Sequence, residues 1–587
     1  MTLDNEKRIM LAFALSFVAL LLYRVMLPPP PKPPAKPAAP ATAPGRPAAA
    51  ASQAAPATAP APPVPVALPV VQGSKAEEIV VENNFYRVTF STEGAVVKSW
   101  ILKKYVDEKG QPLDVVNATA CQTLGFPLSV SLGDEELKAK VNAALYAAQP
   151  SSPTLTPPAR LEFVYSDGKT QVRKQFSFEK AYEAHVTVSV TDGRRELPVE
   201  VAWPGGFGDH SLPAARENTV EQAVYQTADS TKVKLVGLSS SWLGRLFSGG
   251  NGSAQNGLQE DVSGPLAFAG LEDRYFAGIF LPDSPDVKLQ VRRETWTPPD
   301  WKGEEKNKPR ALAVRLGSSQ AKPLDFRLFV APKDLDLLRA VKPPLDALVD
   351  FGWFGFIAKP LFLGLRYLYE RWFHNYGWAI VVLTIFINLA LFPLKLKSIR
   401  SAQEMQRIAP QVKAIQERYK QYKFNDPRKQ RMNQEVMKLY SEHHINPLGG
   451  CLPMALQLPI LYGFYNVLQL PIELRHAPWI GWIKDLSAPD TFHPWGIPVP
   501  ILPTVMVISM FVLQKMTPMA TADPSQQRMM MIMPIVFGIM FYSFASGLVL
   551  YFLTANLVQI AQQAFINRYI PAPQPLPVPR KAAEARE

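Results

Sequence analysis

The stretch TIFINLALFPLK, Thr384 to Lys395, holds one amide, Asn388, inside a long apolar run. The run covers residues 377–394, close to the roughly 20 residues that a helix needs to cross a bilayer. An amide in hydrocarbon costs free energy unless it has a polar partner. The stretch therefore predicts a membrane-spanning helix that carries a polar position.

Other apolar runs of similar length predict further spans. Four of them follow in the sequence, at about 449–470, 498–514, 529–544 and 547–566. The last two are separated only by FASG and should form an antiparallel hairpin. At the N-terminus, Lys7 and Arg8 precede an apolar run from Ile9 to Tyr23 without a small-residue cleavage site, so residues 1–27 are interpreted as an uncleaved transmembrane anchor. The sequence thus predicts six spans.

The basic residues set the orientation of these spans. Twelve Lys and Arg residues lie between 395 and 443, whereas the segment 471–497 has two. By the positive-inside rule the first loop is cytoplasmic and the second lies outside. Both termini, including the tail 571–587, are then cytoplasmic. The formal net charge of +12 is explained by this loop and by an anionic lipid surface, so no specific nucleic-acid partner is expected.

The part between the anchor and the spans has two different compositions. Residues 28–75 are almost all Pro, Ala, Thr and Val, which indicates an extended linker. Residues 76–340 contain short β-branched and aromatic runs such as IVVENNFYRVTF, separated by turns such as SDGK. This pattern predicts an all-β sandwich outside the membrane, with SSSWLGRLFSGGNGSAQNG as a long loop.

This outer part shows no metal or catalytic set. His185 and His210 are isolated in the sequence and are interpreted as structural or surface residues. Cys121 and Cys451, the two cysteines, lack metal-ligand spacing and fall in segments that do not predict a disulfide framework. No cofactor and no metal are expected.

Two helical segments adjoin the spans. Residues 341–376 mix aromatic bulk with charges such as Lys359 and Arg366, and predict an amphipathic helix in the membrane interface. The cytoplasmic segment 395–445 predicts two antiparallel helices joined near FNDP. Their apolar seam has helical spacing and comprises Met405, Ile408, Val412, Ile415 and Tyr419 on one side and Met432, Val436, Leu439 and His443 on the other.

The same hairpin carries many basic side chains: Arg407, Lys413, Arg418, Lys420, Arg428, Lys429 and Arg431. These charges either merely solvate the hairpin or form a basic prong that meets a translating ribosome or an emerging chain. The two interpretations are compatible.

The C-terminal part resembles a known family in several motifs: INPLGGCLPMALQLPILYGFYNVLQLPIELRHAPWIGWIKDLSAPD, QKMTP, TADPSQQRMMMIMP and SGLVLYFLTANLVQIAQQ. They are similar to the core of the YidC membrane-protein insertases, and the anchor, linker and β part resemble the Gram-negative form. The resemblance implies a polytopic α-helical membrane protein of the bacterial inner membrane. It has six transmembrane helices, five of them (within 377–570) forming the insertase core, and a periplasmic β-supersandwich.

The implied activity is insertion and folding of nascent inner-membrane proteins, alone or with the Sec translocon, without enzymatic chemistry. Polar residues on helix faces could line a partly hydrated groove open to the cytoplasm. The candidates are Thr384, Asn388, Lys395, Gln457, Ser509, Gln514, Tyr551, Asn556 and Gln559. For Asn388 and Gln457, ordinary hydrogen bonds between helices remain an alternative.

Two residues depart from the family pattern. Counted from Gly377 and the Phe392-Pro393-Leu394 landmark, Asn388 takes the place of the arginine usual in the groove, and Phe552 replaces the second tyrosine of a pair that begins with Tyr551. We expect Asn388 to keep the groove wet while Lys395 supplies positive charge from the cytoplasmic mouth.

Other function classes find less support in the sequence. A channel or transporter would favour an inverted repeat or Asp and Glu inside the spans, and neither is seen. No HExxH or GxSxG motif suggests a membrane-bound hydrolase in the helical half. An assembly scaffold or chaperone that inserts nothing on its own remains an open alternative.

Overall fold

The computed structural model describes residues 68–577 with internal gaps. The gaps are 108, 180, 194, 212–220, 238–258, 300, 302, 304–307, 352–353, 423–425, 446–451, 470, 491, 493–498, 518–523, 571–573 and 575. The anchor 1–27, most of the linker, the long loop, Cys451 and the end of the tail therefore lie outside the described residues. The chain divides into two compact units, Met1–Ala331 and Pro332–Glu587, and each is described by itself.

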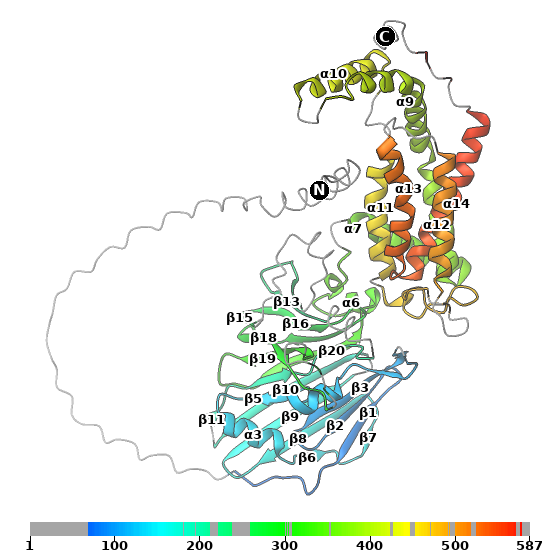
Figure 1. Ribbon diagram of the computed structural model, residues 1–587. Helices are drawn as coiled ribbons and strands as arrows, with labels where there is room; N and C mark the ends of the chain where they lie inside the picture. The colour runs from blue at the N-terminus through cyan, green and yellow to red at the C-terminus, as the bar shows by residue number, and fades with distance from the viewer. Residues whose placement is uncertain are drawn as a thin grey trace, which may run out of the picture. The chain divides into compact units, whose positions relative to one another are not determined.

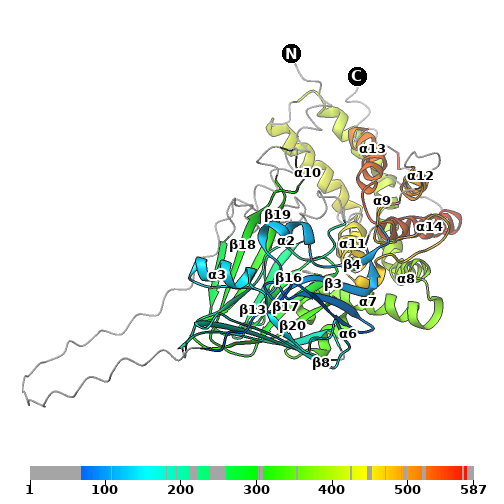
Figure 2. The same ribbon diagram turned by 90° about the horizontal axis from the view of Figure 1, so that it is seen from below.

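The first unit is built from antiparallel strands in stacked sheets (Figures 1 and 2). The strands are β1 Glu78–Glu82, β2 Tyr86–Ser91, β3 Val96–Val106, β4 Pro112–Asp114, β5 Ser129–Ser131, β6 Ala147–Gln149, β7 Thr154–Leu155, β8 Ala159–Ser166, β9 Thr170–Phe178, β10 Glu183–Asp192, β11 Arg195–Glu196, β12 Glu200–Trp203, β13 Gln222–Thr227, β14 Lys234–Gly237, β15 Gln259–Ser263, β16 Leu266–Glu272, β17 Phe276–Pro282, β18 Val287–Thr295, β19 Arg310–Ser318 and β20 Leu324–Pro332.

Three sheets result, and they confirm the predicted β-sandwich. One follows the order β4-β3-β2-β1-β7, the largest β14-β13-β16-β17-β20-β10-β9-β8-β6, and the third β15-β18-β19-β12-β5. Within the described residues, β1 and β7 pair in parallel. Two short helices, α2 Ala118–Leu124 and α3 Glu135–Ala143, interrupt the strands. The strand pattern did not predict these two helices.

Alternating burial along the strands explains the sandwich. In β9 every second residue is buried, and Phe176 and Phe178 pack against Phe90 with ring centroids 4.9 and 6.0 Å apart. Each fully buried aromatic side chain of this kind stabilises the fold by about 1.5–3 kcal/mol. Polar residues between them face away from this core, as the period of two requires.

One buried position of β9 holds a lysine. The Nζ atom of Lys174 donates to the carbonyl oxygens of Gly94, Ala95 and Leu128 at 2.8, 2.9 and 2.9 Å. All three acceptor residues have positive φ angles. Burial lowers the pKa of Lys174 to about 7, but three acceptors match the three donors of an ammonium. The side chain therefore ties two left-handed turns to the sheet.

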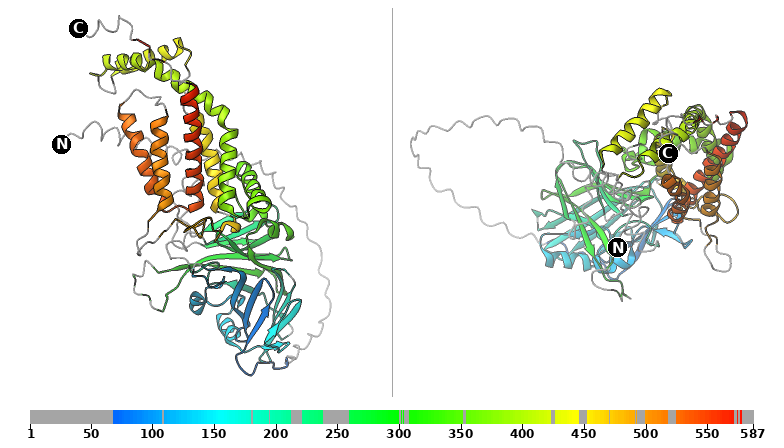
Figure 3. Two further views of the ribbon diagram at one scale, coloured as in Figure 1. Left: turned by 90° about the vertical axis from the view of Figure 1, so that its right-hand side faces the viewer. Right: turned by 45° about the horizontal axis from the view of Figure 1, so that its top comes forward.

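The second unit is helical (Figures 1 and 3). Its helices are α6 Leu335–Ala340, the 3₁₀ turn Asp346–Leu348, α7 Gly355–Leu368 with a π-helical turn Tyr369–Phe373, α8 Tyr376–Ala390, α9 Phe392–Arg418, α10 Pro427–Glu442, α11 Leu452–Gln469, the 3₁₀ turn Ile472–Leu474, α12 Ile501–Met516, α13 Pro524–Phe541 and α14 Ser546–Tyr569. Helices thus occur at each of the five apolar runs predicted after residue 376.

The packing of these helices differs from the expected hairpin of the last two runs. Helix α13 packs against α12, and α14 packs mainly against α12 and α8; Figure 3 shows α12 and α13 side by side. The contact of α13 with α14 is near their connecting turn, where the rings of Phe541 and Phe552 lie 4.6 Å apart. Apolar periodicity predicts a helix face but not the neighbour that covers it.

Length and composition alone do not establish six spans. Within the described residues, Ser546–Tyr569 is the one continuous helix long and apolar enough to cross a membrane. The pair Gly355–Phe373 and Tyr376–Ala390 meets the same criterion together but is bent by 119°. Shorter apolar helices are Ile501–Met516 and Met530–Phe541.

The segment predicted as one amphipathic helix over 341–376 is helical over a shorter range. Its main helix begins at Gly355, and the chain turns at His374, which has a φ of 47°. Arg366 bridges Asp336 and Glu370 at 2.6 and 2.7 Å, joining α7 to α6. Large side chains on this segment are exposed, among them Phe356 (73%) and Trp372 (68%), as an interfacial helix requires.

The predicted cytoplasmic hairpin consists of α9 and α10. Asp426 caps α10 with Pro427 at its first position, the start signal that the sequence indicated. Met405, Ile408 and Val412 of α9 form a buried cluster with Ile445, onto which Val436 and Leu439 of α10 pack. The far end of the seam is polar instead, because Tyr419 Oη donates to Glu435 Oε1 at 2.7 Å.

Candidate functional site

The predicted groove residues gather around α14. This helix faces α8, α11 and α12, and each of these contacts contains a polar pair. The residues do not form one continuous row. They form three hydrogen-bonded groups at different positions along α14.

The first group joins α8, α9 and α14 around Asn388. Asn388 is 3% exposed, and its Nδ2 donates to the Thr384 carbonyl at 2.9 Å. Its Oδ1 accepts from Lys395 Nζ at 2.7 Å, seven residues along the chain. Gln562 Nε2 of α14 donates to the Asn388 carbonyl at 3.0 Å. The spacing of four and seven residues places Thr384, Asn388 and Lys395 on one face, as predicted.

The amino group of Lys395 points toward Asn388. An ammonium has three N–H donors, and one of them is bound by this neutral amide. Among the described residues no carboxylate forms an ion pair with Lys395. Within the described residues, two of its three N–H donors are therefore available to another acceptor beside Asn388.

The second group joins α11 to α14. Gln457 Nε2 donates to Tyr551 Oη at 2.7 Å, and the ring of Tyr551 stacks on Phe464 with centroids 4.2 Å apart. The next residue, Phe552, packs on the apolar ring of Phe541. Of these two neighbouring aromatic residues, Tyr551 is thus the one with a polar partner.

The third group joins α12 to α14. Asn556 Nδ2 donates to Ser509 Oγ at 3.0 Å, and Ser509 Oγ donates to the Met506 carbonyl at 2.6 Å. Further along, Asn567 Nδ2 donates to the Met516 carbonyl at 3.2 Å. These bonds are of the kind that holds helices together in membranes, which was the alternative interpretation for intramembrane amides.

Gln514 and Gln559 are the predicted residues outside these groups. Gln559 is half-buried. Gln514 has a buried Oε1 atom without a hydrogen-bond partner in the described part of the chain. Gln562 Oε1 is likewise buried without a hydrogen-bond partner in the described part of the chain. Gln562 was not among the predicted groove residues, because it lies off the helix face of Asn556, Gln559 and Gln563. Its place beside Asn388 is seen only in the packing of α14 against α8. Such unsatisfied amide oxygens favour a water molecule or a visiting donor.

The basic residues of the hairpin lie mainly at its surface. Arg407, Lys413, Arg418, Lys420, Arg428 and Arg431 are exposed, and Lys429 is half-buried. Arg418 pairs with Glu435 and Arg428 with Asp426, each at 3.1 Å. For Lys413, Lys420 and Lys429, no ion pair occurs within the described residues. These three charges are available to an anionic partner.

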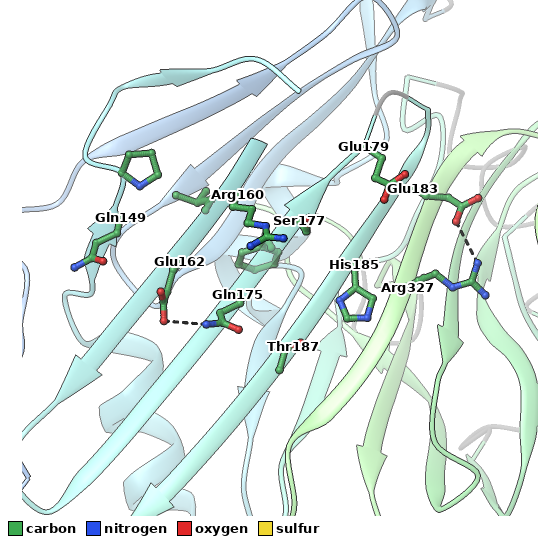
Figure 4. A pocket seen from close by; sticks show the side chains of 13 residues that line it. Gln149, Arg160, Glu162, Gln175, Ser177, Glu179, Glu183, His185, Thr187 and Arg327 are labelled. Carbon is green, nitrogen blue, oxygen red and sulfur yellow. Dashed lines mark hydrogen bonds and ion pairs between the residues drawn. The ribbon is translucent and has the colours of Figure 1, made fainter. Parts of the chain in front are cut away.

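The β unit has a separate hollow of about 870 Å³ on its largest sheet (Figure 4). Polar side chains of β8, β9, β10 and β20 line it, including Arg160 and His185. His185 is not isolated as the sequence suggested, because its Nε2 lies 3.1 Å from Asp283 Oδ2. Arg327 pairs with Glu183 at 3.3 Å. This hollow contains paired charges typical of a solvated sheet face.

Comparison with known proteins matches both units. The family model for the 60Kd inner membrane protein matches residues 368–573, and the model for the YidC periplasmic domain matches residues 78–363. The membrane protein insertase YidC of Syntrophus aciditrophicus is 32% identical over 96% of this chain and 99% of its own length. That of Citrifermentans bemidjiense is 35% identical with the same coverages.

Among solved structures, an active YidC insertase crystal structure with its first transmembrane domain resolved is 20% identical. It matches with a TM-score of 0.33 over 84% of this chain and 94% of its own. The two family models together with the full-length relatives confirm the resemblance seen in the motifs. The chain belongs to the YidC family of membrane protein insertases.

Proposed function

We propose that this chain inserts nascent membrane proteins into the bacterial inner membrane through the Lys395–Asn388–Gln562 group. The observation that carries the proposal is the bond between Lys395 Nζ and Asn388 Oδ1. It brings an ammonium to a buried amide of an otherwise apolar helix. Membership of the insertase family supports the same activity.

The physical obstacle to insertion is the polar flank of the client. A charged residue at the bilayer centre costs about 2.5–3.5 kcal/mol. A carboxylate in that flank would find two unused donors on Lys395, and other polar groups would find the unsatisfied oxygens of Gln562 and Gln514. The apolar segment of the client then gains free energy by leaving toward lipid. No bond is made or broken, so the proposed activity is not enzymatic and needs no cofactor.

The remaining parts of the proposal concern partners and topology. The exposed lysines and arginines of α9 and α10 suit a ribosome, an emerging chain or anionic lipid headgroups. Larger clients would use the Sec translocon beside this chain. Both termini would be cytoplasmic and the β unit periplasmic, with six spans in all.

The test is reconstitution of the purified full-length chain in liposomes with a small client made in vitro. Protection of the client from added protease, above the level of empty liposomes, is the expected result. A chain that binds the client without protecting it would instead be a scaffold or chaperone, the second candidate. Flux of ions or small solutes without protection would indicate a channel.

A further inference from the structure

The C-terminal tail lies along one face of α9. Gln403 Nε2 donates to the Ile570 carbonyl at 3.4 Å, the Leu576 N–H donates to the Arg407 carbonyl at 2.8 Å, and Gln411 Nε2 donates to the Pro577 carbonyl at 3.0 Å. Residues 403, 407 and 411 are four apart, so they share a face of the helix. The contacts of Ile570, Leu576 and Pro577 with α9 therefore extend over about 12 Å of the helix at 1.5 Å per residue.

Pro410 lies inside α9 and has no N–H for the helical ladder. The missing N–H would have bonded the Gln406 carbonyl, four residues earlier, so Pro410 does not itself account for the acceptor that the tail uses. That acceptor is the next carbonyl, of Arg407, which accepts from the Leu576 N–H.

The side chain of Leu576 enters the apolar seam of the hairpin. It packs on a cluster that we name the hairpin slot: Met405, Ile408, Val412, Val436, Leu439, Tyr440 and Ile445. Ile408 and Val412 are 1% and 4% exposed when the tail is in place. Among the described residues packed together here, Leu576 is the one that lies outside the hairpin segment 395–445.

The recognition chemistry of the hairpin slot is simple. It takes one apolar side chain, one backbone N–H next to Arg407 and one backbone carbonyl next to Gln411. These three contacts use only apolar and backbone groups of the described tail residues Leu576 and Pro577. Any extended chain with a large apolar residue satisfies the same three contacts, as in other modes of extended-peptide recognition.

We propose that the hairpin slot is a docking site for an extended apolar segment of a nascent chain, and that the tail occupies it in cis until such a segment displaces it. The proposal rests on the proposed function for the identity of the client. A tethered ligand acts at an effective concentration of about a millimolar, which a client delivered directly to the hairpin can also reach. The tail then keeps the slot covered between clients and prevents its apolar surface from being exposed.

The experiment uses the full-length chain in nanodiscs and stalled ribosome–nascent-chain complexes that carry an apolar segment. A photo-crosslinking amino acid replaces Met437, which is exposed (56%) beside the slot. Leu576→Asp should vacate the slot and raise client crosslinking about tenfold. In a Cys451→Ser background, oxidation of a Gln411→Cys, Pro577→Cys pair should lock the tail in the slot and lower client crosslinking. Gln574→Ala, at an exposed tail residue, is the matched control and should change nothing.

A second measurement keeps the proposal independent of insertion. A labelled peptide with the tail sequence QPLPV should bind the Leu576→Asp chain and bind the parent at least tenfold more weakly. Unchanged crosslinking in Leu576→Asp, or no peptide binding to it, overturns the docking site and leaves the tail as a structural strap. Failure of the parent chain in the protease-protection assay, with peptide binding intact, would overturn the proposed function alone.

Discussion

At position 388 a neutral buried amide is joined to a charged side chain. Asn388 Oδ1 accepts from Lys395 Nζ at 2.7 Å. The sequence predicted the polar face and the two residues on it. It did not predict the bond, because a lysine near a helix end can extend toward the headgroups or back along the helix with similar ease.

Replacement of Asn388 by leucine should release Lys395 from this position. A hydrogen bond to a charged group contributes about 1.5–3 kcal/mol, so insertion of clients with an acidic flank should fall about tenfold. Clients with a neutral flank should be affected less. The rate of protease protection in proteoliposomes measures both. Leu389→Val, at a neighbouring exposed position (56%), is the control, and an equal loss for both client types would contradict the role of charge.

Lys174 should be a determinant of stability in the β unit. Lys174→Met leaves three buried carbonyl oxygens without their donor. The free energy of unfolding should therefore fall by about 2–5 kcal/mol. Amide hydrogen exchange of the full-length chain should report the loss first around Gly94, Ala95 and Leu128. Lys169→Met, at an exposed position, should leave exchange unchanged. Equal protection in both variants would show that the ammonium is dispensable.

At the scale of helices and strands, local sequence signals were sufficient to predict that an element forms. They were not sufficient to predict which other element packs against it. Asp426-Pro427 correctly predicted the start of α10, and the run IVVENNFYRVTF correctly predicted strands, which are β1 and β2. The pairing of the last two apolar runs was wrong in detail, since α12 takes most of the contact. The docking of Leu576 on the hairpin was not predicted, because a short proline-rich tail has no periodicity to interpret.

The bond between Gln457 and Tyr551 should couple α11 to α14. Such bonds in membrane proteins contribute about 0.6 kcal/mol on average. A double-mutant cycle of Gln457→Leu and Tyr551→Phe, measured by unfolding in detergent, should give a coupling energy of about this size. Pairing Gln457→Leu with Phe552→Leu, which has no polar partner to lose, is the matched control. A coupling energy of zero in the first cycle would show that the bond does not hold the helices.

At the scale of the whole molecule, the motifs predicted the family and its two kinds of unit. The sequence was a weaker guide to which helices cross the membrane, because some of the apolar helices are shorter than a bilayer-spanning segment. Contacts between distant segments account for the rest. One such contact places Glu473, after α11, near Asp334 and Arg366, more than a hundred residues earlier.

This contact should make the stability of the second unit depend on pH. Burial is the main cause that raises the pKa of Glu473 to about 7; Asp334 and Asp336 act in the same direction, whereas its backbone hydrogen bond and Arg366 oppose them. Because the folded pKa is above the ordinary value of 4.5, the contribution is complete below about pH 4.5 and is lost as the pH rises through 7. Thermal unfolding in detergent should therefore shift downward over this range. Glu473→Gln should flatten the profile, and an unaltered profile would contradict the assignment.

The most direct test of the central claim replaces Lys395 and compares two clients that differ only in an acidic or neutral flank. With Lys395→Met, insertion of the acidic client into proteoliposomes should fall about tenfold, while Lys395→Arg should retain most of it. The neutral client should respond little to either change. Equal insertion of the acidic client by the parent and by Lys395→Met would contradict the account, because the amino group that Asn388 binds would then play no part in insertion.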